Sequence, residues 1–255
     1  TLKDNGMKVF IGTVTTGACL SVVSQTKADN MFQITPSASA AKVIANDNCF
    51  QVCFTDPNQG TASADYIASK GLATKVAVIY NSSEAFTGYS KQDFSSQLSK
   101  IKASGAELIF LPIYYQEASL ILSQAKNAGI TAKFFGCDGL DGLLNIENFD
   151  KSLAENVMLL TPFAANATNA KYDPSTLNQF AADAYDAVYV VKAAAEKAGV
   201  TGDMSVSDIC NALKGAMTEI TVDGVTGSGM TWKATGEVNK EPKAVKIENG
   251  EYQPM

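Results

Sequence analysis

Short apolar runs alternate with amphipathic stretches along most of the chain. The runs are rich in Val, Ile, Leu and Phe, which is typical of strands that are buried on both faces. They are residues 7–13, 31–35, 49–55, 76–80, 108–112, 133–136 and 157–161. The stretches between them repeat apolar residues at helical spacing, as Phe94, Leu98 and Ile101 do. The predicted helices are residues 20–29, 59–70, 94–103, 117–128, 178–198 and 205–214.

This alternation predicts an α/β fold with parallel sheets that helices cover on both faces. In such sheets ligands bind beyond the carboxyl ends of the strands. The loops that follow the predicted strands are therefore the candidate binding loops, residues 13–19, 35–40, 81–90, 113–116 and 137–142. The tail instead predicts hairpin-like strands at 229–233 and 244–248, with a turn at Asn249 and Gly250.

Composition and charge argue against several classes of function. The 255 residues carry a net charge of −6, which argues against binding to nucleic acid or to anionic membrane surfaces. The chain has no histidine, so the commonest general base and zinc ligand are absent and we expect no enzyme activity. The acidic residues after residue 137 do not have calcium-loop spacing, so we expect no metal and no cofactor.

The five cysteines include no CxxC pair. Cys49 and Cys53 lie four residues apart in a predicted strand, which separates them by roughly 13 Å, too far for a disulfide. An odd count leaves at least one thiol unpaired, or paired outside this sequence.

No run approaches the roughly 20 apolar residues of a membrane span. The chain does not open with a signal-peptide pattern, so we expect a mature or a shortened form.

Small hydroxyl residues follow the first two predicted strands. They are Thr15, Thr16, Ser37 and Ser39. Hydroxyls and free backbone N–H groups ahead of helices suit a carboxylate. The alternative is that the two threonines cap the next helix and the two serines are ordinary turn residues.

The loops after two later strands add an acid and an aromatic ring. Asp138 could hold an ammonium group through a charge-assisted hydrogen bond, or could cap its own loop. Tyr114 and Tyr115 are adjacent, so we expect one to face the ligand and the other to pack. The four loops together suit a zwitterionic amino acid.

Longer segments resemble the leucine/isoleucine/valine-binding protein family, the extracellular solute-binding proteins of ABC importers. The similar segments are VFIGTVTTGACLSVVSQTKADNMFQITPSASA, CFTDPNQG, VAVIY, QDFSSQLSKIKASGAELIFLPIYYQEASLILSQAKNAGI and FFGCDGL. The resemblance implies two Rossmann-like lobes with parallel sheets, joined by three crossings, with the ligand in the cleft. The lobes would be residues 1–55 plus 163–223 and residues 57–161 plus 225–255.

The resemblance also implies roles for individual residues. Thr16 would bind the ligand α-carboxylate together with Ser39, and Ser37 would offer its carbonyl to the α-ammonium. Asp138 stands where the family has an acid that faces the ammonium, and Tyr114 stands at a cleft aromatic. Phe86 matches a second aromatic, although a slip of one residue would put Ala85 there.

This chain departs from the family pattern in two places. The family has an opening βαβα stretch before the helix that ends near Asp4, and a helix and a strand where Ser90 meets Lys91. A parallel crossover needs about a dozen residues. We therefore expect residues to be missing before Thr1, and Ser90 and Lys91 not to be neighbours in the full protein. The missing opening often carries the disulfide partner of the loop that holds Cys19.

The resemblance implies a monomeric, extracytoplasmic protein, periplasmic or lipid-anchored. It would capture a branched-chain or other apolar amino acid and deliver it to an ABC transporter permease. One alternative is an enzyme on a similar fold, which the lack of histidine, of a phosphate loop and of a CxxC motif disfavours. A second is a ligand-sensing regulatory or receptor domain, which would keep the site and change the partner. A third is a fragment that no longer binds a ligand.

Overall fold

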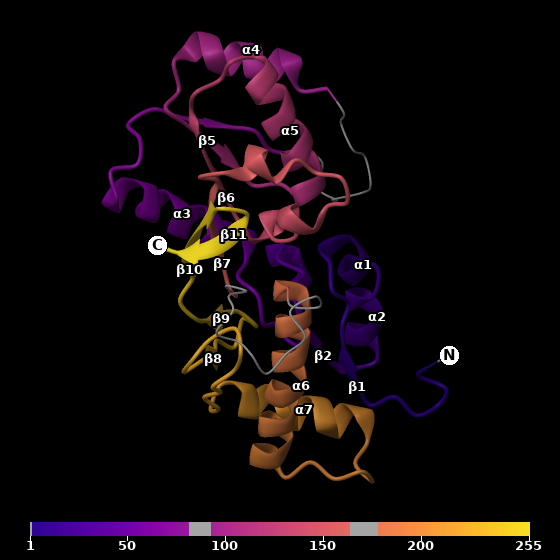
Figure 1. Cartoon of the computed structure of the whole chain (residues 1–255). Helices are drawn as coiled ribbons and strands as arrows, with labels where there is room; N and C mark the ends of the chain where they lie inside the picture. Colours follow the sequence, from indigo (N-terminus) through magenta and orange to yellow (C-terminus); the bar gives the residue numbers. More distant parts are fainter. Residues whose placement is uncertain (1, 82–92, 164–177) are drawn as a thin grey trace. The chain divides into compact units, whose positions relative to one another are not determined.

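The computed structural model describes residues 2–81, 93–163 and 178–255, and Figure 1 shows the chain with its helices and strands labelled. The chain divides into two compact units. Unit 1 comprises Thr1–Pro57 and Phe180–Glu241, and unit 2 comprises Asn58–Gln179 and Pro242–Met255. The chain therefore passes from one unit to the other three times.

Unit 1 is built on a three-stranded parallel sheet with the order β1-β2-β3. Its strands are β1 (Val9–Ile11), β2 (Phe32–Thr35) and β3 (Cys49–Gln51). Its helices are α1 (Thr16–Leu20), α2 (Val23–Ala28), α6 (Gln179–Ala198, from Phe180 on) and α7 (Val206–Met217).

Strand β2 is buried along its whole length because helices cover both of its faces. Phe32 and Ile34 belong to the core that α6 and α7 complete, and the Phe32 ring stacks on Phe50 with centroids 5.4 Å apart. Gln33 faces the opposite side, where its Oε1 accepts a 2.6 Å hydrogen bond from the Thr26 hydroxyl of α2. Side chains that alternate between two covered faces explain why this strand is a continuous buried run.

The sheet of unit 2 has six strands in the order β11-β10-β7-β6-β5-β4. The parallel strands are β4 (Val76–Val78), β5 (Leu108–Leu111), β6 (Lys133–Gly136) and β7 (Met158–Thr161). The antiparallel strands are β10 (Lys243–Glu248) and β11 (Glu251–Pro254). The helices are α3 (Asp56–Ser69, from Asn58 on), α4 (Ser95–Ser104) and α5 (Tyr115–Asn127).

Consecutive residues of β5 serve two separate cores. Leu108 packs with Ile67 of α3 on one face. Ile109 packs with Leu98 of α4 and Ile121 of α5 on the other. The uninterrupted apolar run of this strand is what a doubly covered parallel strand requires.

The α/β class and the parallel sheets are confirmed. The strands predicted at 108–112, 133–136 and 157–161 are β5, β6 and β7. The turn predicted at Asn249 and Gly250 joins β10 to β11, and both residues have positive φ, which suits this residue pair in a tight hairpin. The helix predicted at 20–29 is instead two short helices, α1 and α2, and the first begins earlier, at Thr16.

The two units differ from the predicted lobes at the second and third crossings. These fall between Gln179 and Phe180 and between Glu241 and Pro242, not near 161–163 and 223–227. The third crossing is shifted because a short hairpin before it packs on unit 1. This hairpin pairs β8 (Thr231–Trp232) with β9 (Val238–Asn239). The Trp232 indole N–H donates a 2.7 Å hydrogen bond to the Gln51 carbonyl, which fixes the hairpin against β3.

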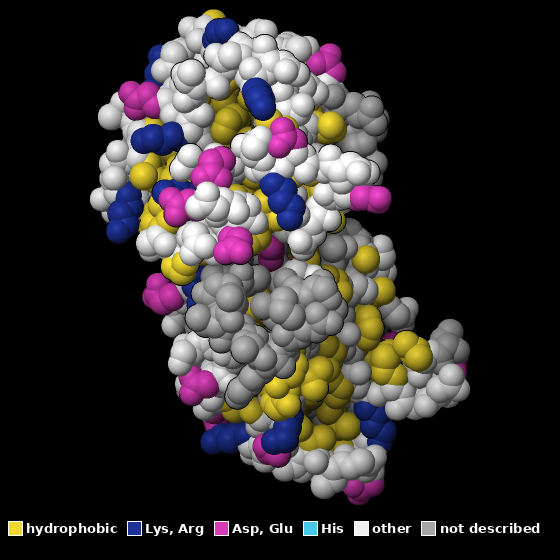
Figure 2. Space-filling view, viewed as in Figure 1, with side chains coloured by type: hydrophobic (Ala, Val, Ile, Leu, Met, Phe, Trp, Pro, Cys, Tyr) yellow, Lys and Arg dark blue, Asp and Glu magenta, His cyan; other side chains and the backbone are white. Residues whose placement is uncertain are grey.

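Apolar side chains gather on one surface of unit 1, around α6 (Figure 2). Tyr185, Val188 and Tyr189 of α6 are each more than a third exposed, as are Ile11 and Val14. The tyrosine rings lie against each other with centroids 4.7 Å apart. In the described sheet of unit 1, β1 is an edge strand.

The five cysteines are buried, and none forms a disulfide within the described part of the chain. Cys19 and Cys49 share a small cluster under α1 and α2. A hydrogen bond with the Cys49 thiol lowers the pKa of Cys19 to about 7, and the same contact raises the pKa of Cys49.

None of the helices in the described ranges combines the length and the apolar character that a bilayer span demands.

Candidate functional site

In unit 1 the loop after β2, residues 36–40, is fixed at almost every position. The Thr35 hydroxyl donates to the Thr13 carbonyl at 2.6 Å and accepts from the Ala38 N–H at 3.1 Å. The Ser37 hydroxyl donates to Asp183 Oδ2 at 2.9 Å, and the Ser39 carbonyl accepts from the Asp56 N–H at 2.8 Å. This loop is therefore a rigid element and not an open turn.

Thr16 lies beside this loop. It is the first residue of α1 and is buried, and its hydroxyl accepts a 3.3 Å hydrogen bond from the Ala40 N–H. The structure thus brings Thr16 together with the loop that holds Ser37 and Ser39. Thr15 is exposed and its side chain makes no capping hydrogen bond, so the capping interpretation does not describe this residue.

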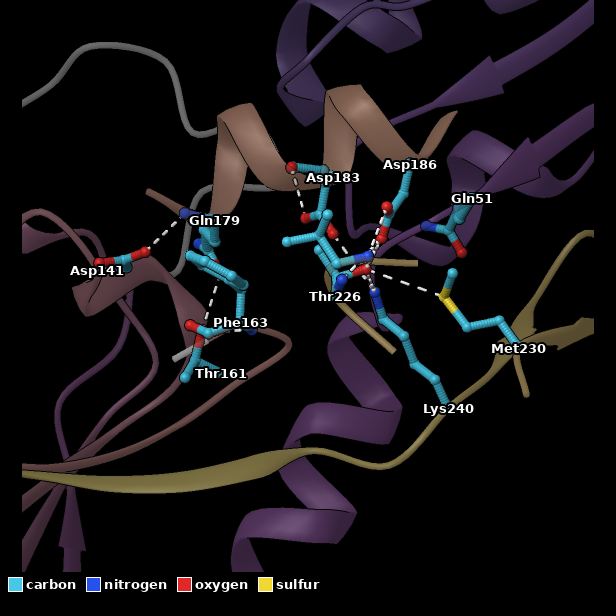
Figure 3. Close-up of polar contacts among 12 residues, drawn as sticks. Gln51, Asp141, Thr161, Phe163, Gln179, Asp183, Asp186, Thr226, Met230 and Lys240 are labelled. Carbon is cyan, nitrogen blue, oxygen red and sulfur yellow. Dashed lines mark hydrogen bonds and ion pairs between the residues drawn. The ribbon is translucent and has the colours of Figure 1, made fainter. Parts of the chain in front are cut away.

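A buried ion pair, drawn in Figure 3, is joined to the same loop through the Ser37 hydroxyl. Lys240 Nζ lies 3.3 Å from Asp183 Oδ1, and both side chains are fully buried, at 0% exposure. Lys240 also donates to the Thr226 hydroxyl at 2.9 Å, and Thr226 donates to Asp186 Oδ2 at 2.6 Å. Burial raises the pKa of the Asp183 carboxyl, and the Lys240 charge opposes that rise.

Sequence reasoning missed this network, although α6 carries a sign of it. Asp183 and Asp186 occupy positions on the buried face of the helix, among Ala182, Ala187 and Val190. Acidic residues at core positions need a partner. The partner Lys240 lies far along the chain, in a segment that the apolar pattern does not distinguish.

In unit 2 the Asp138 loop is held by two buried glutamines. Gln179 Nε2 donates to the Asp138 carbonyl at 2.7 Å, and Gln59 Oε1 accepts from the Asp138 N–H at 3.4 Å. The Gln179 N–H also donates to Asp141 Oδ2 at 2.8 Å (Figure 3). These contacts fix the backbone of Asp138, whose side chain is half-buried.

The Asp138 loop and the Tyr114 loop approach each other closely, because they follow the neighbouring parallel strands β6 and β5. A Cβ placed on Gly139 would lie 2.6 Å from the Ile113 carbonyl oxygen and 3.4 Å from Tyr114 Cδ1. Tyr114 is half-buried at the start of α5, whereas Tyr115 packs against the core of unit 2. One tyrosine of the pair packs, as predicted.

Gly139→Ala is expected to lower the free energy of unfolding by about 1–3 kcal/mol, the range for forcing extra carbon into a packed site. The contacting atom is a backbone oxygen, which cannot turn aside as a side chain could. Urea denaturation measures the change. Gly215→Ala in α7 is the matched control, because nothing lies within 4 Å of its added Cβ and alanine favours a helix. Equal stability of Gly139→Ala and the parent protein would contradict the close approach of the two loops.

Two predictions fall outside the described residues. Phe86, the predicted second aromatic, lies there, and so does the junction of Ser90 with Lys91. Within the described ranges, no group of three or more His, Cys, Asp or Glu is arranged to hold a metal ion.

Comparison with known proteins points to one family. The family model described as periplasmic binding protein matches residues 82–251, which is more than half of the chain. A Leu/Ile/Val-binding protein homolog of Brucella melitensis is 28% identical over 79% of this chain and 64% of its own length. A leucine-, isoleucine-, valine-, threonine- and alanine-binding protein of Pseudomonas aeruginosa is 25% identical over 82% of this chain and 65% of its own length. This chain therefore spans somewhat less than two thirds of either relative.

The fold has a close counterpart among solved structures. The branched-chain amino acid transporter substrate binding protein LivJ of Streptococcus pneumoniae, solved in complex with isoleucine, superposes with a TM-score of 0.81. The match covers 99% of this chain and 79% of that one, at 24% identity. At this identity the likeness establishes the fold.

Proposed function

The chain belongs to the periplasmic binding protein family, and on that premise we propose that it captures a branched-chain or other apolar amino acid and delivers it to an ABC importer. Members of this family are extracytoplasmic and bind solutes without being enzymes, in agreement with the expectation from the missing histidine. Its partners would be the amino acid and the transporter permease. The protein would act as a monomer, periplasmic or lipid-anchored at the outer face of the membrane.

The observation that carries the proposal is the contact of Thr16 with the loop of Ser37 and Ser39 in unit 1. The first N–H groups of a helix lack partners inside the helix, and a threonine hydroxyl beside them adds a further donor for a carboxylate. Ser39 would bind the same carboxylate. Thr15, which is exposed, would lie at the edge of this carboxylate site.

The ammonium of the ligand would be recognised by oxygen atoms. In unit 1 the loop carbonyls of Pro36, Ala38 and Ser39 already accept hydrogen bonds, from Cys53 N–H, Gln51 Nε2 and Asp56 N–H. Within the described part of the chain, none of the hydrogen bonds ends on the Ser37 carbonyl. This supports a role for that carbonyl as an acceptor for the ligand. In unit 2 the Asp138 carboxylate would supply the balancing charge, and Tyr114 and Phe86 would cover the apolar body.

Thermal unfolding in the presence of each of the twenty amino acids tests the proposal. Leucine, isoleucine or valine at a hundred times its Kd should stabilise the protein by about 2.7 kcal/mol, a rise in Tm of about 5–10 °C for a chain of this size. Isothermal titration then gives the affinity of each positive ligand. If no amino acid raises Tm, or if the bound amino acid is chemically converted, the proposed function is wrong.

A further inference from the structure

The loop that carries Ser37 is tied to residues that flank two of the three chain crossings. Asp183 comes shortly after the chain enters unit 1 at Phe180, and Lys240 comes immediately before it leaves at Glu241. Ser37 donates to Asp183, and Asp183 pairs with Lys240 (Figure 3). The loop and the two crossing segments are therefore parts of one hydrogen-bonded network inside unit 1.

The network uses the Ser37 hydroxyl, not its carbonyl. The side chain of Ser37 is buried, and its Oγ is engaged by Asp183 Oδ2 at 2.9 Å. The carbonyls on either side are also held: that of Pro36 accepts from the Cys53 N–H and that of Ala38 from Gln51 Nε2. The peptide of Ser37 therefore has little freedom to rotate. A preorganised acceptor binds more tightly because its ordering cost has been met before the ligand arrives.

We propose that Asp183, balanced by Lys240, is a positioning residue for the ligand: it holds Ser37 so that the Ser37 carbonyl is presented to the ammonium group of the amino acid. This inference rests on the proposed function. Asp183 does not itself touch the ligand in this scheme. Lys240 supplies the charge that a buried carboxylate requires, and the Phe54 ring, 5.5 Å from Lys240 Nζ, covers the pair.

Ser37→Ala removes the tether and keeps the backbone carbonyl. We expect the affinity for leucine, measured by isothermal titration, to fall about tenfold, which corresponds to about 1.4 kcal/mol of lost loop ordering. Ser37→Thr retains a hydroxyl for Asp183 and should restore most of the affinity. Ser228→Ala is the matched control, since Ser228 makes a comparable hydrogen bond to Asp223, at 2.6 Å, in another loop of unit 1. Its affinity should stay within twofold of the parent protein.

Amide hydrogen exchange of residues 38–40 supplies the second readout, without ligand. The three amides should exchange faster in Ser37→Ala than in the parent, and at the parent rate in Ser228→Ala. If Ser37→Ala loses affinity while exchange is unchanged, the hydroxyl contacts the ligand directly and the positioning role is wrong. If the parent binds leucine and Ser37→Ala binds it equally well, this inference fails while the proposed function stands. A parent protein that binds no amino acid overturns both.

Discussion

Lys240→Met is expected to lower the free energy of unfolding by about 3–5 kcal/mol, the cost of removing one partner from a buried ion pair. The substitution keeps a chain of similar length and leaves Asp183 buried with only the Ser37 hydroxyl as a described side-chain donor. It also removes the donor to Thr226. Urea denaturation should show a lower midpoint at an unchanged m-value, since the surface exposed on unfolding stays the same.

Two further variants separate the buried charge from other effects. Lys192→Met breaks an ion pair with Glu196 whose partners are both more than half exposed, so it should leave the urea midpoint nearly unchanged. Lys240→Met combined with Asp183→Asn removes both charges and should recover much of the lost stability. A loss below about 1 kcal/mol in the free energy of unfolding for Lys240→Met alone would contradict the prediction, because the fold would then tolerate buried Asp183 without Lys240.

The sequence predicted the central strands β5 and β7 of unit 2 well because they are buried along most of their length. Leu108 and Ile109 serve opposite cores, so the whole segment is apolar and stands out from the helices around it. The short helices α1 and α2 were harder to predict. Their boundary at Ser21 and Val22 carries neither proline nor glycine, and local propensity gives no reason to end a helix there.

The boundaries of the units could not be predicted from local pattern. The segment with Gly224, Gly227 and Gly229 has the composition of a flexible connection. In the structure it packs inside unit 1, where a Cβ on Gly224 would lie 2.5 Å from the Asp186 carboxylate. Long-range contacts, such as the hydrogen bonds of Gln51 with Trp232 and with Gly236, decide to which unit the hairpin of β8 and β9 belongs.

Candidate ligand residues were easier to predict than the residues that support them. Parallel strands end at one edge of a sheet, so the loops of Thr16 and Ser37 in unit 1 were expected to be neighbours, as were those of Tyr114 and Asp138 in unit 2. The supporting residues in unit 2 are Gln59 and Gln179, which lie far from Asp138 in the sequence. Buried amides carry no sequence pattern, because their partners are backbone groups that any residue offers.

Asp138→Ala is expected to weaken amino-acid binding by about 2–4 kcal/mol, or roughly 30-fold to 900-fold in Kd. The loss arises because the ligand ammonium would be desolvated on binding and would meet no compensating charge. Gln59 and Gln179 bond the backbone N–H and carbonyl of residue 138, and the variant keeps both of these contacts. Isothermal titration with the ligand identified by thermal unfolding measures the effect.

Two matched variants assign this loss to the charge of Asp138. Asp138→Asn keeps the size and one acceptor oxygen, so it should lose most of the same free energy if the charge is what the ligand requires. Asp150→Ala removes a carboxylate of the same unit that caps Ser152 at the surface, and it should bind as the parent does. Unchanged affinity of Asp138→Ala in a protein that binds amino acids would remove Asp138 from the site. The ammonium would then depend on the Ser37 carbonyl and its tether to Asp183, and Ser37→Ala would become the variant with the larger loss.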